Sequence, residues 1–160
     1  MKVRTATRDD VPLILTFIHE LAAYEKLAQE VVATEETLAA TLFDTQPRAE
    51  VLLAEVDGAA VGFALFFHNY STFLGRPGIF LEDLFVRPEA RGRGAGRALL
   101  ARLAAIAKER GCGRLEWAVL DWNESAIGFY RKLGATALSN WTTYRLTGEA
   151  LARLAGEGPH

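Results

Sequence analysis

"EARGRGAGRALL" occupies residues 89–100, where glycines alternate with other residues, arginines surround them, and an alanine- and leucine-rich run follows. Glycine is less favourable than alanine inside a helix by roughly 1 kcal/mol per residue, so bare backbone must be needed here for another reason. The first amides of a helix have no partner within the helix, and the helix dipole adds about half a positive charge there. The stretch therefore predicts a loop that holds a phosphate-like anion at the start of a helix.

Other glycine-rich motifs fit this stretch less well. A P-loop requires Gly-Lys-Ser/Thr at the end of the loop, and this chain has none there. The dinucleotide-binding fingerprint is Gly-x-Gly-x-x-Gly, whereas the spacing here is Gly-x-Gly-x-Gly. An RNA-binding segment of the RGG type is unusual inside a folded acidic domain. The alternative without a ligand is a glycine-rich turn with incidental arginines.

The pattern around the loop predicts an α/β fold. Asp57-Gly58 between two apolar runs is a hairpin signal, and Thr34 followed by acidic residues is typical of a helix start. Gly111 and Gly134 are placed to end helices. Helices are expected over residues 8–24, 34–43, 94–110 and 125–133, and strands over residues 2–7, 51–56, 60–67, 79–86, 114–120, 135–138 and 142–146.

Length and composition narrow the class of protein. The 160 residues carry a formal net charge of −2, without the basic surplus that nucleic-acid binding requires. No apolar run approaches the roughly 20 residues of a membrane span and no secretory leader is recognised, so a cytoplasmic protein is predicted. The single cysteine excludes an internal disulfide, and neither His19 nor His68 has a ligand partner at metal-site spacing, so no metal is expected. We expect one domain over residues 1–155 and a disordered tail over residues 156–160.

Three segments together resemble one enzyme family. The pattern RxxGxG at residues 91–96, after a strand and at the start of a helix, is similar to the acetyl-CoA motif of the GNAT family of N-acetyltransferases. The strand Leu81–Val86 and the segment Asp121–Ala135, which ends in FYRKLGA, resemble the flanking segments of that family. The resemblance covers about residues 2–147. It implies a single-domain mixed, mostly antiparallel central sheet flanked by helices.

The resemblance also implies that acetyl-CoA is the co-substrate and that the glycine loop binds its pyrophosphate. Backbone groups of the preceding strand would meet the pantetheine arm. Asn123 would bind the cofactor while it caps the next helix, and a plain helix cap is the alternative. The cofactor-binding residues implied are Leu84, Phe85, Val86, Arg91, Gly92, Arg93, Gly94, Ala95, Gly96, Arg97, Asn123, Ser125, Ala126 and Tyr130.

Two residues are candidates for the chemistry of acetyl transfer. The resemblance makes Tyr130 the general acid, since a phenol can donate a proton to a departing thiolate; packing beside Phe129 is the alternative. Glu82 and Asp83 are adjacent acids in an apolar strand, so their side chains point to opposite faces and their roles must differ. The resemblance assigns Glu82 to deprotonation of the amine through water and Asp83 to support or substrate contact. The alternative is a solvated strand end.

The amine-binding residues are predicted from the N-terminal segment. Glu20–Glu25 is similar to the branch of the family that acetylates diamines (spermidine, spermine and thialysine). Enzymes of that branch carry a run of acidic residues after this segment, whereas residues 26–30 here contain only one acid. Those enzymes also carry an acid near the last strand, at the position of the uncharged Thr142. A small primary amine, polyamine or lysine-like, is implied as substrate; a protein or peptide amine, or a non-catalytic acyl-CoA-binding module, are the alternatives. The substrate-binding residues implied are Tyr24, Glu25, Glu82, Asp83, Glu116, Trp117 and Ala118.

A second copy of the chain is the other expected partner. The resembled diamine enzymes pair through their C-terminal strands, so the resemblance implies a homodimer. Trp141 and Tyr144 would supply aromatic area suited to such an interface. Neither nucleic acid nor a membrane is expected as a partner.

Overall fold

The computed structural model describes residues 1–157 and divides into two units, residues 1–120 and the chain from Asp121 onward. The first four strands of the first unit are antiparallel, and the fifth runs parallel to the fourth. This arrangement confirms the predicted mixed, mostly antiparallel sheet. In spatial order the strands are β1 (Lys2–Thr5), β2 (Glu50–Val56), β3 (Ala59–Ser71), β4 (Arg76–Val86) and β5 (Leu115–Trp117).

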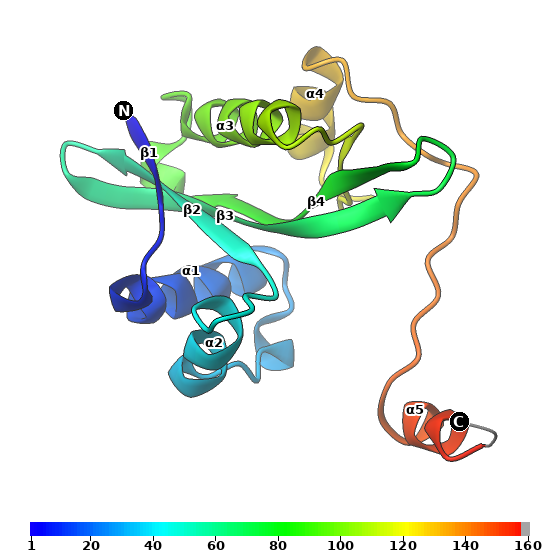
Figure 1. Ribbon diagram of the computed structural model, residues 1–160. Coiled ribbons are helices and arrows are strands. Elements are labelled where there is room, and N and C mark those ends of the chain that lie inside the picture. The colour runs from blue at the N-terminus through cyan, green and yellow to red at the C-terminus, as the bar shows by residue number, and fades with distance from the viewer. Residues whose placement is uncertain (158–160) are drawn as a thin grey trace. The chain divides into compact units, whose positions relative to one another are not determined.

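Helices cover both faces of this sheet (Figure 1). α1 (Val11–Tyr24) and α2 (Glu35–Leu42) lie on one face, and α3 (Ala95–Glu109) lies on the other. The start of α2 confirms the predicted cap, because the Thr37 N–H donates to Thr34 Oγ1 at 3.1 Å while the Thr34 N–H donates to Thr37 Oγ1 at 3.0 Å. Short 3-10 turns occupy residues 8–10, 28–30 and 88–90.

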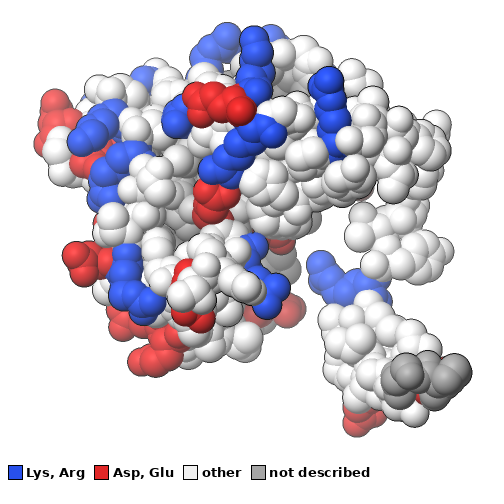
Figure 2. Space-filling view, in the orientation of Figure 1, with Lys and Arg blue, Asp and Glu red and all other residues white. Residues whose placement is uncertain are grey.

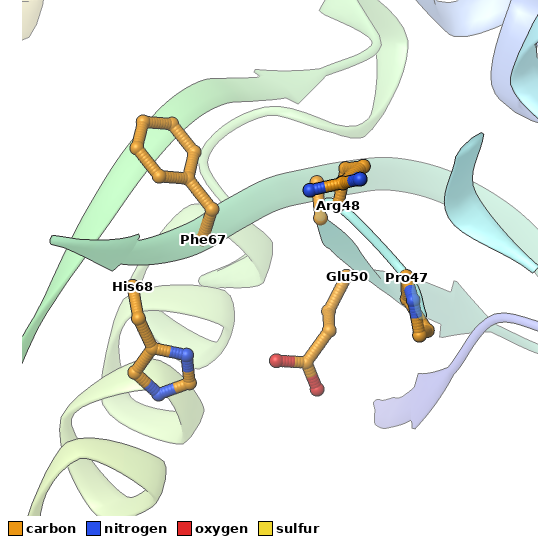
Figure 3. Close-up of a pocket in the computed structure, with 6 residues that line it drawn as sticks. Pro47, Arg48, Glu50, Phe67 and His68 are labelled. Atoms are coloured by element: carbon orange, nitrogen blue, oxygen red, sulfur yellow. The ribbon is translucent and has the colours of Figure 1, made fainter. Parts of the chain in front are cut away.

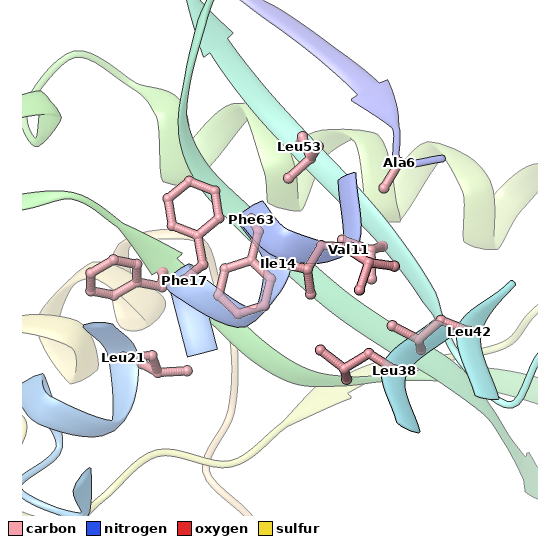
Figure 4. Packing of buried hydrophobic residues seen from close by; sticks show 11 residues of the cluster. Ala6, Val11, Ile14, Phe17, Leu21, Leu38, Leu42, Leu53 and Phe63 are labelled. Carbon is pink, nitrogen blue, oxygen red and sulfur yellow. The ribbon is translucent and has the colours of Figure 1, made fainter. Parts of the chain in front are cut away.

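A hydrophobic core fixes α1 and α2 against the sheet (Figure 4). Phe17 of α1 stacks on Phe63 of β3 with 5.5 Å between ring centroids, and it contacts Phe85 of β4 at 6.3 Å. Burying a side chain of this size contributes about 1.5–3 kcal/mol relative to exposure. These contacts set the end of α1 beside the end of β4. The other members of the cluster are Ala6, Val11, Ile14, Leu21, Leu38, Leu42, Val51 and Leu53.

The turn between β2 and β3 agrees with the sequence, and the hairpin of β3 and β4 is longer than the predicted strands. Asp57 and Gly58 have φ values of 53° and 78°, and a tight hairpin turn of this kind requires positive φ at both positions. β3 and β4 extend over residues 59–71 and 76–86 instead of 60–67 and 79–86. The extra residues are largely polar, so their apolar periodicity is weak. Pairing between the two strands extends them beyond the last residue of β3 that pairs with β2.

Three predicted strands need correction. The strand expected over residues 114–120 is limited to residues 115–117. The strands expected over residues 135–138 and 142–146 are wrong, since neither segment belongs to a sheet in the described chain. Alternating apolar residues favour a strand only where a neighbouring strand supplies hydrogen-bond partners.

The second unit contains α4 (Glu124–Lys132) and α5 (Gly148–Ala155). The sequence predicts α4 to within one residue, but α5 is absent from the prediction. Gly156 follows α5, and its N–H donates to the carbonyl of Ala152 at 3.1 Å. The remaining residues of the predicted tail, 158–160, lie outside the described residues, so the boundary after residue 155 stays a prediction. No helix in the described chain is long and apolar enough to cross a membrane.

Candidate functional site

β4 carries a β-bulge at Glu82. The register with β3 passes from Leu65 opposite Asp83 to Phe66 opposite Leu81, so Glu82 is the extra residue. β5 pairs with β4 only as far as Leu81. Beyond the bulge, therefore, strand pairing of β4 within the described residues involves β3 alone. Because a bulge bends and twists its strand, it marks the point where one edge of β4 opens.

The open edge of β4 presents specific backbone groups. The Arg87 N–H donates to the Val61 carbonyl at 2.8 Å, and residues in an antiparallel ladder alternate in the side to which their N–H and C=O point. The backbone groups of Phe85 therefore face β3. Those of Leu84 and Val86 face the open edge. The Val86 carbonyl accepts a hydrogen bond from Arg91 Nε, so the backbone groups of Leu84 and the Val86 N–H are the ones that could pair with an extended ligand.

The glycine loop begins α3 without a side-chain cap. Its cap residue is Gly94 with φ 86°, and Gly92 has φ 78°; this left-handed conformation strains any residue with a side chain. Gly96 differs, because its φ is ordinary and an added Cβ would lie 3.9 Å from Val86 Cγ2, a normal contact. The fold itself thus tolerates a side chain at Gly96. Bare backbone at that position instead leaves room for a ligand at the helix start.

Arg91 joins the glycine loop to β4 and α1. Its Nε donates to the Val86 carbonyl at 2.9 Å. Its guanidinium carbon lies 4.7 Å from the centre of the Tyr24 ring and 5.8 Å from the centre of the Phe85 ring. The structure therefore brings together the predicted cofactor residue Arg91 and the predicted substrate residue Tyr24. Arg93 and Arg97 are exposed.

A second arginine, which the sequence analysis missed, also fixes the end of α1. Arg87 forms an ion pair with Glu20 at 3.1 Å and lies 4.8 Å over the Phe17 ring. Arg87 and Glu20 are 67 positions apart, and no local pattern in either segment predicts their meeting. The pair appears only when the core sets α1 beside β4.

Three carboxylates gather at the same end of β4. Burial, together with the negative charges of Glu82 and Glu25, raises the pKa of Asp83 to about 6, and burial is the largest cause. Burial also raises the pKa of Glu25, the residue directly after α1. Glu82 is exposed at the bulge. A group of negative charges in this setting would attract an ammonium ion.

The predicted substrate residues of β5 lie beside β4 just before the bulge. Glu116 is opposite Phe80 and Trp117 is opposite Leu81. The Asn69 Nδ2 donates to the Glu116 carboxylate at 3.2 Å, so that acid is held by a side chain of β3. Ala118 follows the end of β5 and is exposed.

The remaining predicted site residues belong to the second unit. Asn123 is buried, and its Oδ1 accepts a hydrogen bond from the Ala126 N–H at 3.3 Å, which confirms it as a helix cap. Ser125 is exposed in the first turn of α4. Tyr130 is half-buried near the end of the helix, with 5.7 Å between its ring centre and that of Phe129.

A different cavity, of about 280 Å³, lies at the start of β2 (Figure 3). Glu50 and His68 direct their side chains to one side of it, and Arg110 binds the Glu50 carboxylate at 2.6 and 2.8 Å. This bidentate pair lowers the pKa of Glu50. The cavity contains none of the predicted site residues. Its lining is Pro47, Arg48, Ala49, Glu50, Phe67 and His68.

Charge is mixed on the face shown in Figure 2, where acidic and basic side chains alternate. That face has no continuous basic surface, in keeping with the net charge of −2. Positive charge for a bound anion can come from local groups, and the glycine loop with its arginines supplies them.

Comparison with known proteins agrees with this geometry. Residues 17–135 match the model of the acetyltransferase (GNAT) family. The chain is 41% identical to thialysine N-epsilon-acetyltransferase of Bos taurus, over 97% of each chain. It is 35% identical to the L-ornithine N5-acetyltransferase of Arabidopsis thaliana, over 94% of this chain and 86% of that one.

A solved structure has the same fold over nearly the whole chain. It is an integron cassette protein from the mobile metagenome of V. cholerae, 28% identical, with a TM-score of 0.80 and coverage of 98% of both chains. The matched region of the family model includes the bulge of β4, the glycine loop and all of α4.

Proposed function

The chain belongs to the acetyltransferase (GNAT) family and is an N-acetyltransferase; from this premise we propose that it moves an acetyl group from acetyl-CoA to the primary amine of a small molecule. The observation that carries the proposal is the meeting of two features at one end of β4. The glycine loop that begins α3 suits a pyrophosphate, and Glu25, Glu82 and Asp83 suit an ammonium ion. Acetyl transfer requires the donor and the amine to be bound next to each other, so a site for each must lie at the same place.

The residues around the loop fit acetyl-CoA, the co-substrate that GNAT acetyltransferases use. An added Cβ at Gly94 would meet nothing within 4 Å, and one at Gly96 would make only an ordinary contact, so there is space for a ligand against the backbone. We assign the pyrophosphate to the loop amides with Arg91, Arg93 and Arg97, and the pantetheine arm to the open edge of β4. Bound acetyl-CoA would supply the thioester that the amine attacks.

Within this proposal the acids of β4 prepare the amine. An alkylammonium ion with a pKa near 10 must lose a proton before it can attack a thioester. Glu82, exposed at the bulge, would accept that proton through water. Asp83 and Glu25 would hold the cation in place, and Tyr130 would donate a proton to the departing sulfur. The support for Glu82 is its position beside two other carboxylates, and the support for Tyr130 is the family motif.

We further propose a lysine-like amine as substrate. Thialysine and ornithine, named in the relatives above, are amino acids whose side chains end in a primary amine. A small polyamine shares that terminal group and is the second candidate, and a peptide amine is the third. The alternative of a non-catalytic acyl-CoA-binding module is set aside, because the chain is an N-acetyltransferase.

A panel of acceptors tests the substrate. Release of CoA from acetyl-CoA would be measured with thialysine, ornithine, putrescine, spermidine and a lysine-containing peptide, each against a reaction without acceptor. We expect the highest kcat/KM for thialysine or ornithine. A higher value for the peptide would transfer the assignment to protein substrates, and release that no acceptor increases would contradict amine acetylation.

Substitution at Gly96 tests the cofactor site. A leucine there would occupy the space in front of the helix start, while the ordinary φ and the helical position leave the fold stable or more stable. We expect acetyl-CoA to bind at least about tenfold more weakly, a loss of about 1.4 kcal/mol. Wild-type affinity of Gly96→Leu in isothermal titration calorimetry would contradict the assignment.

We also propose a cytoplasmic homodimer. The predicted C-terminal strands are absent, but Trp141 and Tyr144 are 80% and 92% exposed, and aromatic residues are enriched at interfaces. Light scattering at micromolar concentration would give twice the chain mass; a monomeric mass would contradict the proposal.

A further inference from the structure

The contact between Arg91 and Tyr24 connects residues that the sequence assigns to different substrates. Arg91 belongs to the glycine loop, and Tyr24 is the last residue of α1, directly before Glu25. The guanidinium carbon lies 4.7 Å from the centre of the Tyr24 ring, within the range of a cation–π interaction. The sequence gives no sign of this contact, because the two residues are far apart in the chain.

The contacts of Arg91 hold its side chain in a defined orientation. Nε is bound to the Val86 carbonyl at 2.9 Å, and the guanidinium lies over the Tyr24 ring and 5.8 Å from the centre of the buried Phe85 ring. A planar guanidinium that stacks on aromatic rings can still direct its terminal N–H groups toward phosphate oxygens. The rings therefore orient the group without competing for the anion.

The backbone that carries Tyr24 is itself held in place. α1 ends in a Schellman motif, in which the Leu27 N–H donates to the Ala22 carbonyl at 2.8 Å and the Lys26 N–H donates to the Ala23 carbonyl at 3.1 Å. One turn earlier on α1, Glu20 forms its ion pair with Arg87. Tyr24 thus lies between two fixed points.

We propose that Tyr24 is a positioning residue for Arg91, and that the end of α1 thereby sets the affinity of the glycine loop for acetyl-CoA. The inference rests on the proposed function, because it requires Arg91 to take part in cofactor binding. Its consequence is that a residue on the amine side controls binding on the cofactor side. The ring carries this role, and the Tyr24 hydroxyl does not.

A double-mutant cycle tests the proposal, with the dissociation constant of acetyl-CoA measured by isothermal titration calorimetry. Loss of an exposed cation–π contact should weaken binding about two- to fivefold in Tyr24→Leu. Tyr24→Phe and Tyr24→Trp keep a ring and should bind as the wild type does. In the Arg91→Ala background, Tyr24→Leu should have no further effect. Tyr70→Leu removes a 64% exposed tyrosine near the opposite end of the β3–β4 hairpin and should change nothing.

The outcomes separate this inference from the proposed function. Wild-type affinity of Arg91→Ala would contradict the role of Arg91 in the cofactor site, and with it the assignment of the loop. Weak binding by Arg91→Ala together with wild-type binding by Tyr24→Leu would overturn the positioning role alone. An equal loss from Tyr24→Leu with and without Arg91 would also overturn it, because the effect would then be a general disturbance of α1.

Discussion

Two regions of the larger unit hold carboxylates in opposite settings. Near β1, the guanidinium of Arg4 binds Asp10 at 2.8 and 2.9 Å and lowers the pKa of Asp10 to about 2. At the bulge of β4, burial raises the pKa of Asp83 to about 6, and the neighbouring Glu82 and Glu25 act in the same direction. One aspartate is stabilised as an anion, whereas the other is held in surroundings that disfavour its charge.

The difference separates carboxylates that an arginine binds within the fold from the carboxylates that we propose bind the substrate amine. Glu50, bound by Arg110, resembles Asp10, since both carboxylates have lowered pKa values and arginine partners. A carboxylate that an arginine already binds is stabilised little by an additional cation. Clustered acids with a raised pKa are stabilised more by a bound cation, and such groups are enriched at functional sites. Asp83 belongs to that second group.

Tyr130→Phe should give the largest change, and it separates the chemistry of the leaving group from that of the acids. The phenol would act only as the C–S bond breaks, so turnover should fall roughly 10²-fold or more while the affinity for acetyl-CoA changes little. Equal losses in binding and turnover would instead make Tyr130 a cofactor-positioning residue, and unchanged turnover would support a packing role.

Glu82→Gln tests the proposed base, and the same substitution at an acid that is bound by an arginine provides the comparison. Removing the base should lower kcat/KM roughly tenfold to 10²-fold near neutral pH, with partial recovery at high pH where more amine is already deprotonated. The matched control is Glu55→Gln, because Glu55 is bound by Arg4 and should not affect the reaction. A pH profile of Glu82→Gln that matches the wild type would move the base role to Glu116 or to water alone.

Asp83→Asn should lower activity and raise stability. The folded-state pKa of about 6 lies above the ordinary value of 3.8, so the folded state binds more protons between these values and stability falls as pH rises through this window. At pH 7 the neutral asparagine should therefore stabilise the fold, by up to about 3 kcal/mol if the whole shift is recovered. Loss of a contact with the ammonium ion should lower kcat/KM about tenfold. Urea unfolding at pH 7 and steady-state kinetics measure both, and a destabilised variant with full activity would reverse the assignment.

Asp10→Asn should have the opposite outcome. Its folded-state pKa of about 2 lies below the ordinary 3.8, so the stability it contributes is present above about pH 4 and is lost as pH falls toward 2. At pH 7 the variant should lose about 1 kcal/mol of stability, since a partly exposed ion pair is weakened by solvent. Activity per folded molecule should not change. Unfolding midpoints from pH 2 to 7 would show the difference from wild type shrinking at the acidic end.

Local signals in the sequence predicted most of the fold. Asp57-Gly58, the Thr34 cap and Gly111, whose φ is 71°, mark turns and helix ends because their side chains or their freedom act on the adjacent backbone. Residues 135–138 and 142–146 show the limit of such signals. Their strand pattern is real, but a strand also requires a partner that the pattern does not specify.

The sequence provides candidate site residues one by one, but it does not predict the contacts between them. Arg91 and Tyr24 were both candidates, yet their stacking depends on the packing of α1 against β4. The bulge at Glu82 likewise depends on how β3 and β4 align, and the adjacent acids alone do not reveal it. Long-range pairing determines both features, and a single sequence carries no local signal for either.

Glu25→Gln should give the smallest effect, and it tests whether the three acids act as one group. Glu25 raises the pKa of Asp83 through its charge, but burial is the larger cause. Removing that charge should therefore shift the pKa of Asp83 downward only slightly. The titration of Asp83 can be followed by carboxyl-carbon NMR on protein labelled at aspartate, with Asp83→Asn to assign the signal. Glu30→Gln, on the exposed turn after α1, is the matched control and should leave the titration unchanged. An unchanged titration in Glu25→Gln would mean that Glu25 does not act electrostatically on Asp83, and the contrast with Asp10 would then rest on burial and Glu82 alone.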